Sequence, residues 1–141
     1  MRLTKHLMVG LAVAAIAASG ATAHDNPGHH GPACRPAPVY LAGTLTSDPG
    51  VSDTSFQLMV KHANRAGRLY VKASNPVTVN VDSKTRIRKD GDQVAVDALA
   101  LNDRALVMAK VCRADLKKAK ETGGALPDLT ARLVLAKAPS A

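Results

Sequence analysis

Aromatic residues are nearly missing from this 141-residue chain, which has no tryptophan, one phenylalanine (Phe56) and two tyrosines (Tyr40 and Tyr70). Proteins that bind single-stranded nucleic acids use aromatic side chains as platforms on which the bases stack. This scarcity argues against specific nucleic-acid recognition, although the formal net charge of +8 attracts polyanions in general.

Motifs that assemble a catalytic site are also missing. The chain has no G-x-S-x-G motif, and His62 is the only histidine between residues 39 and 136. One histidine among scattered serines and aspartates does not indicate a catalytic triad, which is defined by its geometry. Asp90 and Asp92 in the stretch KDGD resemble part of a calcium loop, but Glu121 is the only glutamate, and an EF-hand loop needs one at its last position. We therefore predict that the protein is not an enzyme and that Asp-Gly forms a tight hairpin turn.

Long apolar runs are missing except at the N-terminus. Arg2 and Lys5 precede an apolar run over residues 7–18, which is followed by a small-x-small site ending at Ala23. These are the three parts of a secretory signal peptide, and the run is shorter than the roughly twenty residues that span a bilayer. We predict a signal peptide over residues 1–23, a periplasmic or secreted product and no transmembrane segment after its removal; a retained membrane anchor is the alternative.

Cysteine is scarce as well, with only Cys34 and Cys112 present. Two cysteines in an exported chain favour one structural disulfide. The bridge would close a loop of about 79 residues, for which the chain-entropy model gives roughly 4.5 kcal/mol of stabilisation. A reactive thiol pair is the alternative, but the chain has no C-x-x-C spacing to support it.

Proline, glycine and histidine are concentrated in residues 24–38, which we predict to form an extended arm. His24, Asp25, His29 and His30 offer imidazole and carboxylate groups, and imidazole suits copper and zinc. A short histidine-rich tract is only a compositional signal, so a solvated processed end without a cofactor is the favoured interpretation. A periplasmic protein that binds copper or zinc through this arm is the alternative function.

Period-two alternation of apolar and polar residues begins at Val39 and indicates half-buried strands. Turn signals separate five to seven short strands, which predicts one small all-β sandwich or barrel, and a barrel leaves fewer exposed edges. A short helix or loop that ends at Gly123 precedes the last strand, and residues 137–141 form a frayed tail. The predicted strands lie within residues 39–46, 55–61, 67–73, 77–81, 92–96, 104–112 and 128–137, with residues 85–88 as a short continuation of the strand over 77–81.

The order of these pieces resembles a family of small exported bacterial β-barrels known only as a domain of unknown function. The stretches LAGTLTSD, SFQLMV, VTVNVDSKTRI, LALNDRALVMAKV and LTARLVL carry the resemblance, which covers roughly residues 39–136. It implies an OB-like barrel and supplies no catalytic residue. Asn102 stands where the family usually has glycine, but asparagine tolerates the left-handed conformation. The matching positions are Gly43, Phe56, Val79, Val81, Asp82, Thr85, Ile87, Leu99, Asp103, Ala105, Val107, Leu129, Ala131 and Val134.

Basic residues cluster in two predicted hairpins, and we expect a positive surface if the hairpins adjoin. Such a face would dock an anionic envelope polymer or an acidic partner protein, whereas a solvated edge with protective charges is the alternative. We therefore predict a non-enzymatic binding or accessory module of the bacterial cell envelope. The candidate residues are Lys61, Arg65, Arg68 and Lys72 in one hairpin and Lys84, Arg86, Arg88 and Lys89 in the other.

Overall fold

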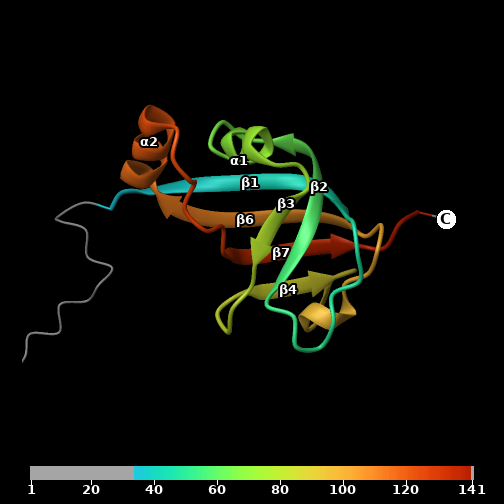
Figure 1. Ribbon diagram of the computed structural model, residues 1–141. Coiled ribbons are helices and arrows are strands. Elements are labelled where there is room, and N and C mark those ends of the chain that lie inside the picture. The colour runs from blue at the N-terminus through green and yellow to red at the C-terminus, as the bar shows by residue number, and fades with distance from the viewer. Residues whose placement is uncertain (1–33, 141) are drawn as a thin grey trace, which may run out of the picture.

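A computed structural model describes residues 34–140, which are dominated by β-strands (Figure 1). The predicted signal peptide and residues 24–33 of the predicted arm lie outside the described residues. The elements are, in chain order, β1 (Pro36–Leu45), β2 (Ser55–Ala63), α1 (Gly67–Ala73), β3 (Val77–Asn80), β4 (Arg86–Lys89), β5 (Asp92–Gln93), a 3-10 helix (Val96–Ala98), β6 (Arg104–Cys112), α2 (Arg113–Thr122) and β7 (Ala131–Lys137).

The strands of residues 34–140 form one curled sheet in the order β3-β2-β1-β6-β7-β4-β5. Only β4 and β7 pair in parallel; the other neighbouring strands of this sheet are antiparallel. The curl brings the end of β3 to the segment before β7, where the Asn80 N–H donates to the Leu129 carbonyl at 2.8 Å. The resulting half-barrel confirms the prediction of a small all-β, barrel-like domain.

The concave face of the sheet holds an aliphatic core. Over residues 37–41 of β1, 56–60 of β2 and 105–111 of β6 every second residue is buried, as the alternation in the sequence predicts. Burying each large aliphatic side chain stabilises the fold by about 1.5–3 kcal/mol. The largest fully buried side chains are Val39, Leu41, Leu45, Leu58, Val79, Leu99, Asp103, Val107 and Val134.

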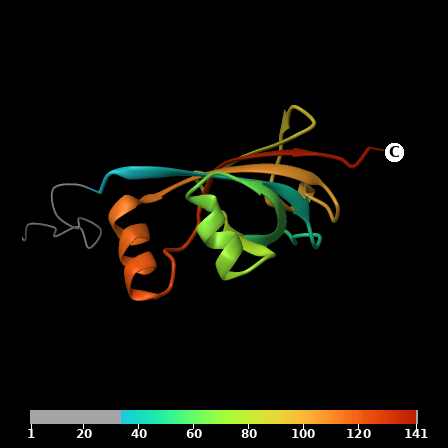
Figure 2. The same ribbon diagram turned by 90° about the horizontal axis from the view of Figure 1, so that it is seen from above.

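Both α-helices lie on the same side of the sheet, over its concave face (Figure 2). Helix α1 buries Tyr70 and α2 buries Leu116 and Ala119. Helix α2 ends at Gly123, which adopts a left-handed conformation (φ 66°) that glycine tolerates best. The predicted helix before the last strand is therefore confirmed, and it starts directly after β6.

The predicted strand over residues 67–73 is wrong, because these residues form helix α1. Asn64 starts the helix: its side-chain oxygen accepts a hydrogen bond from the Gly67 N–H at 2.8 Å. Its amide nitrogen donates to the Pro38 carbonyl at 2.8 Å and so ties the helix start to β1. Gly67 permits this close approach, since a Cβ there would lie 2.7 Å from the Tyr40 carbonyl oxygen. A seven-residue apolar pattern does not distinguish the two periods by itself.

The predicted arm ends earlier than expected, because β1 begins at Pro36 and includes Pro38. Over these residues β1 pairs with β6 alone, and its pairing with β2 starts only at Leu41. A proline is tolerated where its missing N–H would face an unpaired strand edge. Tyr40 follows on the same edge of β1. Its N–H donates to the side chain of Asn64 and not to a neighbouring strand.

The alternation predicted for the last strand is interrupted at Arg132. Leu133 pairs with Met108 and Ala131 with Ala109, so Arg132 is an extra residue in β7. Such a bulge shifts the inward set by one position, and Val134 is buried instead of Leu133. The predicted strand over residues 92–96 is also shorter, because β5 contains only Asp92 and Gln93.

Two predicted tight turns are confirmed. Asp90 (φ 51°) and Gly91 (φ 96°) form the two-residue loop between β4 and β5, which is the hairpin expected for Asp-Gly. Asn102 has a φ of 68° and takes the left-handed position at the turn before β6.

The predicted disulfide is confirmed. Cys34 and Cys112 are bonded, with their Cα atoms 5.2 Å apart. The bridge lies at the end of the β1–β6 ladder, since Cys112 lies opposite Pro36, two residues after Cys34. It therefore closes the chain around six of the seven strands.

We predict that reducing this disulfide lowers the free energy of unfolding by up to roughly 4.5 kcal/mol, because the unfolded chain regains the entropy of an open loop. Urea unfolding of the oxidised protein and of the Cys34→Ser/Cys112→Ser variant measures the difference. Equal urea midpoints for the two proteins would show that the ladder needs no covalent closure.

Tyr70 supplies a second, pH-dependent test of the packing. Its hydroxyl donates to the Pro127 carbonyl at 2.9 Å, and burial together with the nearby Asp128 raises its pKa to about 12. A raised pKa means that the native state keeps this proton while the unfolded state loses it. Stability is therefore unaffected below pH 10 and falls between pH 10 and about 12. Tyrosinate absorbance of a Tyr40→Phe variant, which reports Tyr70 alone, should titrate near 12; a midpoint near 10 would contradict the burial of this hydroxyl.

Candidate anion-binding face

The eight predicted cations do not form a single surface, because the first predicted hairpin is a strand followed by a helix. Lys61 lies on β2, whereas Arg68 and Lys72 lie on α1, and these three line a hollow at the junction of the two elements. Arg65 lies in the turn between β2 and α1 and lines a different groove, between α1 and α2.

Lys84 lies in the turn before β4, two residues after the acidic Asp82. Its backbone N–H donates to the Asp82 carboxylate at 2.8 Å. This hydrogen bond, with further ones from Thr85 and the charge of Arg132, lowers the pKa of Asp82. The carboxylate beside Lys84 is therefore ionised at neutral pH.

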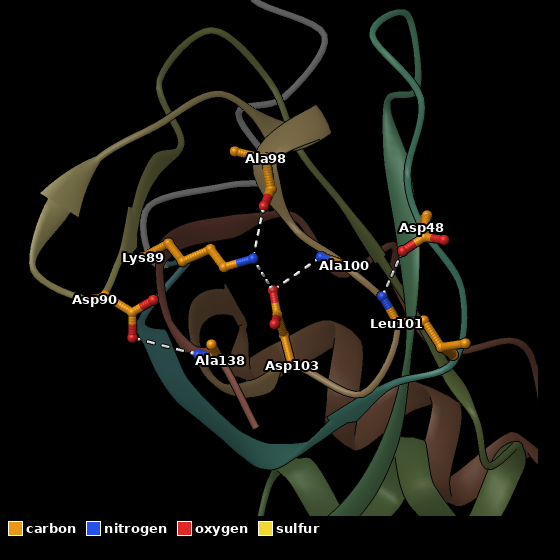
Figure 3. A network of polar contacts seen from close by, with 8 residues as sticks. All are labelled: Asp48, Lys89, Asp90, Ala98, Ala100, Leu101, Asp103 and Ala138. Atoms are coloured by element: carbon orange, nitrogen blue, oxygen red, sulfur yellow. Dashed lines mark hydrogen bonds and ion pairs between the residues drawn. The ribbon is translucent and has the colours of Figure 1, made fainter. Parts of the chain in front are cut away.

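Lys89 points into the protein, which corrects its assignment to an exposed basic face (Figure 3). Its ammonium group lies 2.8 Å from Oδ2 of Asp103, whose side chain is 1% exposed, and it donates to the Ala98 carbonyl at 2.9 Å. Oδ2 of Asp103 also accepts the Ala100 N–H, while Oδ1 is buried without a hydrogen-bond partner among the described residues. Lys89 is thus the counter-ion of a buried carboxylate.

Arg86 and Arg88 do reach a wide surface, which we call the outer face. It consists of the outward side chains of β1, β2, β4, β6 and β7, on the side opposite the two helices (Figure 2). Ile87 between the two arginines is buried, so both arginines point outward. Because β4 pairs with β7, Arg86 and Arg88 lie beside the outward side chains of β7.

Two cross-strand rows run over the outer face. The first row places Arg86 beside Leu133, which pairs with Met108, which pairs with Tyr40. Side chains directly opposite each other in a sheet lie about 4.5–5.5 Å apart at Cβ, so each row is a continuous surface. The second row consists of Arg88, Leu135, Leu106, Ala42 and His62.

The centre of the outer face is an apolar strip that remains partly exposed. Tyr40 is 42% exposed and Leu135 37%. A patch of neighbouring apolar side chains bordered by polar ones commonly marks an interaction surface.

A shallow hollow of about 480 Å³ opens at one end of the strip. Lys61, His62 and Arg104 line it together with Thr44 and the apolar Leu106 and Leu135. Lys61 reaches this position because the register of β1 and β2 shifts between Ala42 and Gly43 and leaves Lys61 as the extra residue. The bulge thus puts three nitrogen-bearing side chains around one concavity, which suits an anionic group.

Carboxylates are missing from the outward positions of the five strands that form this face. Neither of the two ion pairs within residues 34–140 involves an outer-face cation. Three cations of this face, Arg104, Lys110 and Lys137, were not among the residues predicted from the sequence, although the alternation along β6 and β7 places them outward. Six basic residues of the outer face stand without an acidic neighbour: Lys61, Arg86, Arg88, Arg104, Lys110 and Lys137. The bulge residue Arg132 is also exposed, but it lies near Asp82 and is not counted with them.

The metal prediction concerns His24, Asp25, His29 and His30, which lie outside the described residues. Within residues 34–140, no group of three or more His, Cys, Asp or Glu side chains is arranged to hold a metal ion. Across the same residues, no helix has both the length and the apolar character needed to cross a membrane.

Comparisons with known proteins supply no relative: models of protein families, curated proteins and solved structures were each searched without a match. The class of the protein therefore follows from its own structure. It is a small, mostly β, disulfide-closed half-barrel with a cationic and apolar outer face.

We predict that removing either of two neighbouring cations of β4 changes the free energy of unfolding by very different amounts. Lys89→Met leaves the buried Asp103 without a counter-ion and should cost about 3 kcal/mol of stability. Arg88→Met removes the same charge from an exposed position and should stay within about 0.5 kcal/mol of the parent protein. Urea midpoints of the two variants measure this; equal losses would mean that Lys89 is not the partner of Asp103.

Proposed function

We propose that this protein is a non-enzymatic binding module of the bacterial cell envelope that docks an anionic partner on its outer face. The observation that carries the proposal is the combination of six exposed cations with a continuous apolar strip and no carboxylate among the outward residues. The predicted signal peptide supports the location in the envelope.

The two parts of the face would contribute in different ways. The apolar strip stabilises a bound partner by about 25 cal/mol for each Å² that leaves water. The cations raise the association rate and select negative partners, and their effect weakens with salt because the Debye length is about 8 Å at physiological ionic strength. Binding should therefore decrease with salt yet persist in part, since the apolar contribution is not screened.

The hollow would hold the partner's anionic group. Lys61 and Arg104 supply permanent charges and Thr44 a hydroxyl group, and no carboxylate lines the hollow. A general acid–base site usually sets a titratable group against a second one that shifts its pKa. Because this hollow is lined by basic residues and no carboxylate, it supports binding of an anion over catalysis.

We expect a Lys61→Gln/Arg104→Gln variant to lose at least about tenfold in affinity for vesicles containing phosphatidylglycerol, because both charges at the hollow are removed. Co-sedimentation at physiological salt measures it, and heparin retention gives a second anionic probe.

The matched control is Lys118→Gln/Lys120→Gln, which removes two exposed lysines of α2 that lie off the outer face and line no hollow with Lys61. It should bind like the parent protein. An equal loss in both variants would mean that net charge alone drives the attraction, and the proposed face would then be rejected.

A further inference from the structure

A second concave site lies on the opposite side of the sheet, between α1 and α2. Figures 1 and 2 both place the two helices next to each other on this side. The α1–α2 groove has a volume of about 490 Å³, within the range of small-molecule sites. Its residues are distinct from those of the outer-face hollow.

The inside of this groove is apolar. Ala37 and Pro38 of β1 form part of the lining, Ala66 and Leu69 come from the α1 side, and Leu116 comes from α2. Asn64 is the one uncharged polar side chain in the lining, and its amide is already bonded to the Pro38 carbonyl and to the Tyr40 and Gly67 N–H groups. The groove therefore offers an occupant hydrocarbon contacts and few hydrogen bonds.

Every charged residue in the lining of the groove is basic. Arg65 precedes α1, while Arg113, Lys117 and Lys120 belong to α2. Lys117 has a neighbour in Glu121, with 3.7 Å between charged atoms and both side chains largely exposed. The other three cations form no ion pair within residues 34–140. Long basic side chains can pack their stems on apolar surface while their charged ends stay in water.

We infer that the α1–α2 groove binds a free fatty acid. The acyl chain lies along Leu69 and Leu116, and the carboxylate is held at the entrance by Arg65 and Arg113, whose guanidinium groups match a carboxylate in bidentate geometry. The volume suits one acyl chain, and the charge of the entrance selects an anionic head group over a neutral one.

Calorimetric titration of the disulfide-bonded protein with laurate, kept below its micelle threshold, tests this inference. We expect saturable one-to-one binding of laurate and no binding of dodecyl maltoside, which has the same chain and a neutral head. Equal binding of the two amphiphiles, or none of laurate, would overturn the inference. Binding of lysophosphatidylglycerol without laurate would also overturn it, by assigning the site to a phospholipid.

A pair of charge-matched variants locates the site. Arg65→Gln/Arg113→Gln should weaken laurate binding about tenfold or more, whereas Lys61→Gln/Arg104→Gln should change it less than about twofold. All four residues are exposed, so both variants are expected to fold. An equal loss in the two variants would reject the groove as the binding site.

Amide chemical shifts of the unmodified protein provide an independent readout. Laurate should shift the signals of Ala37, Leu69 and Leu116 and leave those of Leu106 and Leu135 on the outer face unchanged. The reverse pattern would place the fatty acid on the outer face and overturn the inference. Because the outer face is tested with separate variants, either proposal can fail without the other.

Discussion

The antiparallel ladder between β1 and β6 is the constraint on which the other elements depend. The two strands pair along almost their whole length, from Pro36 opposite Cys112 to Thr44 opposite Arg104. Strands β2 and β7 add to the two free edges of this ladder, and β3 and β4 add to those in turn. The ladder joins segments far apart in the chain, so its formation costs the loop entropy that the disulfide at its end reduces.

This ladder also separates the two proposed binding sites. Because side chains alternate along a strand, inward residues such as Val39 and Val107 build the core, while Tyr40 and Met108 build the outer face. The helices cover only the concave side, and the disulfide lies where β6 passes into α2. One sheet therefore presents a cationic surface on its outer side and a groove between helices on its inner side.

Much of the strand content was predictable from the sequence. The inward sets of β1, β2 and β6 follow from alternation, and the turns at Asp90-Gly91 and Asn102 follow from residues that tolerate positive φ. The prediction was wrong at residues 67–73, because a distant contact decides their conformation: Asn64 bonds to β1 and starts a helix there. It was also wrong at Lys89, whose partner Asp103 approaches through the fold and not along the chain.

By itself, the sequence determined which residues alternate, where the chain turns and that two cysteines were available for one bridge. These are local properties, set by side-chain period, backbone freedom and composition. Only the tertiary structure decided which cations share a surface. Arg88 and His62 lie at opposite ends of one row because β7, β6 and β1 come between their strands. Strand order and register depend on how the curled sheet closes its core, and neither is encoded in any single segment.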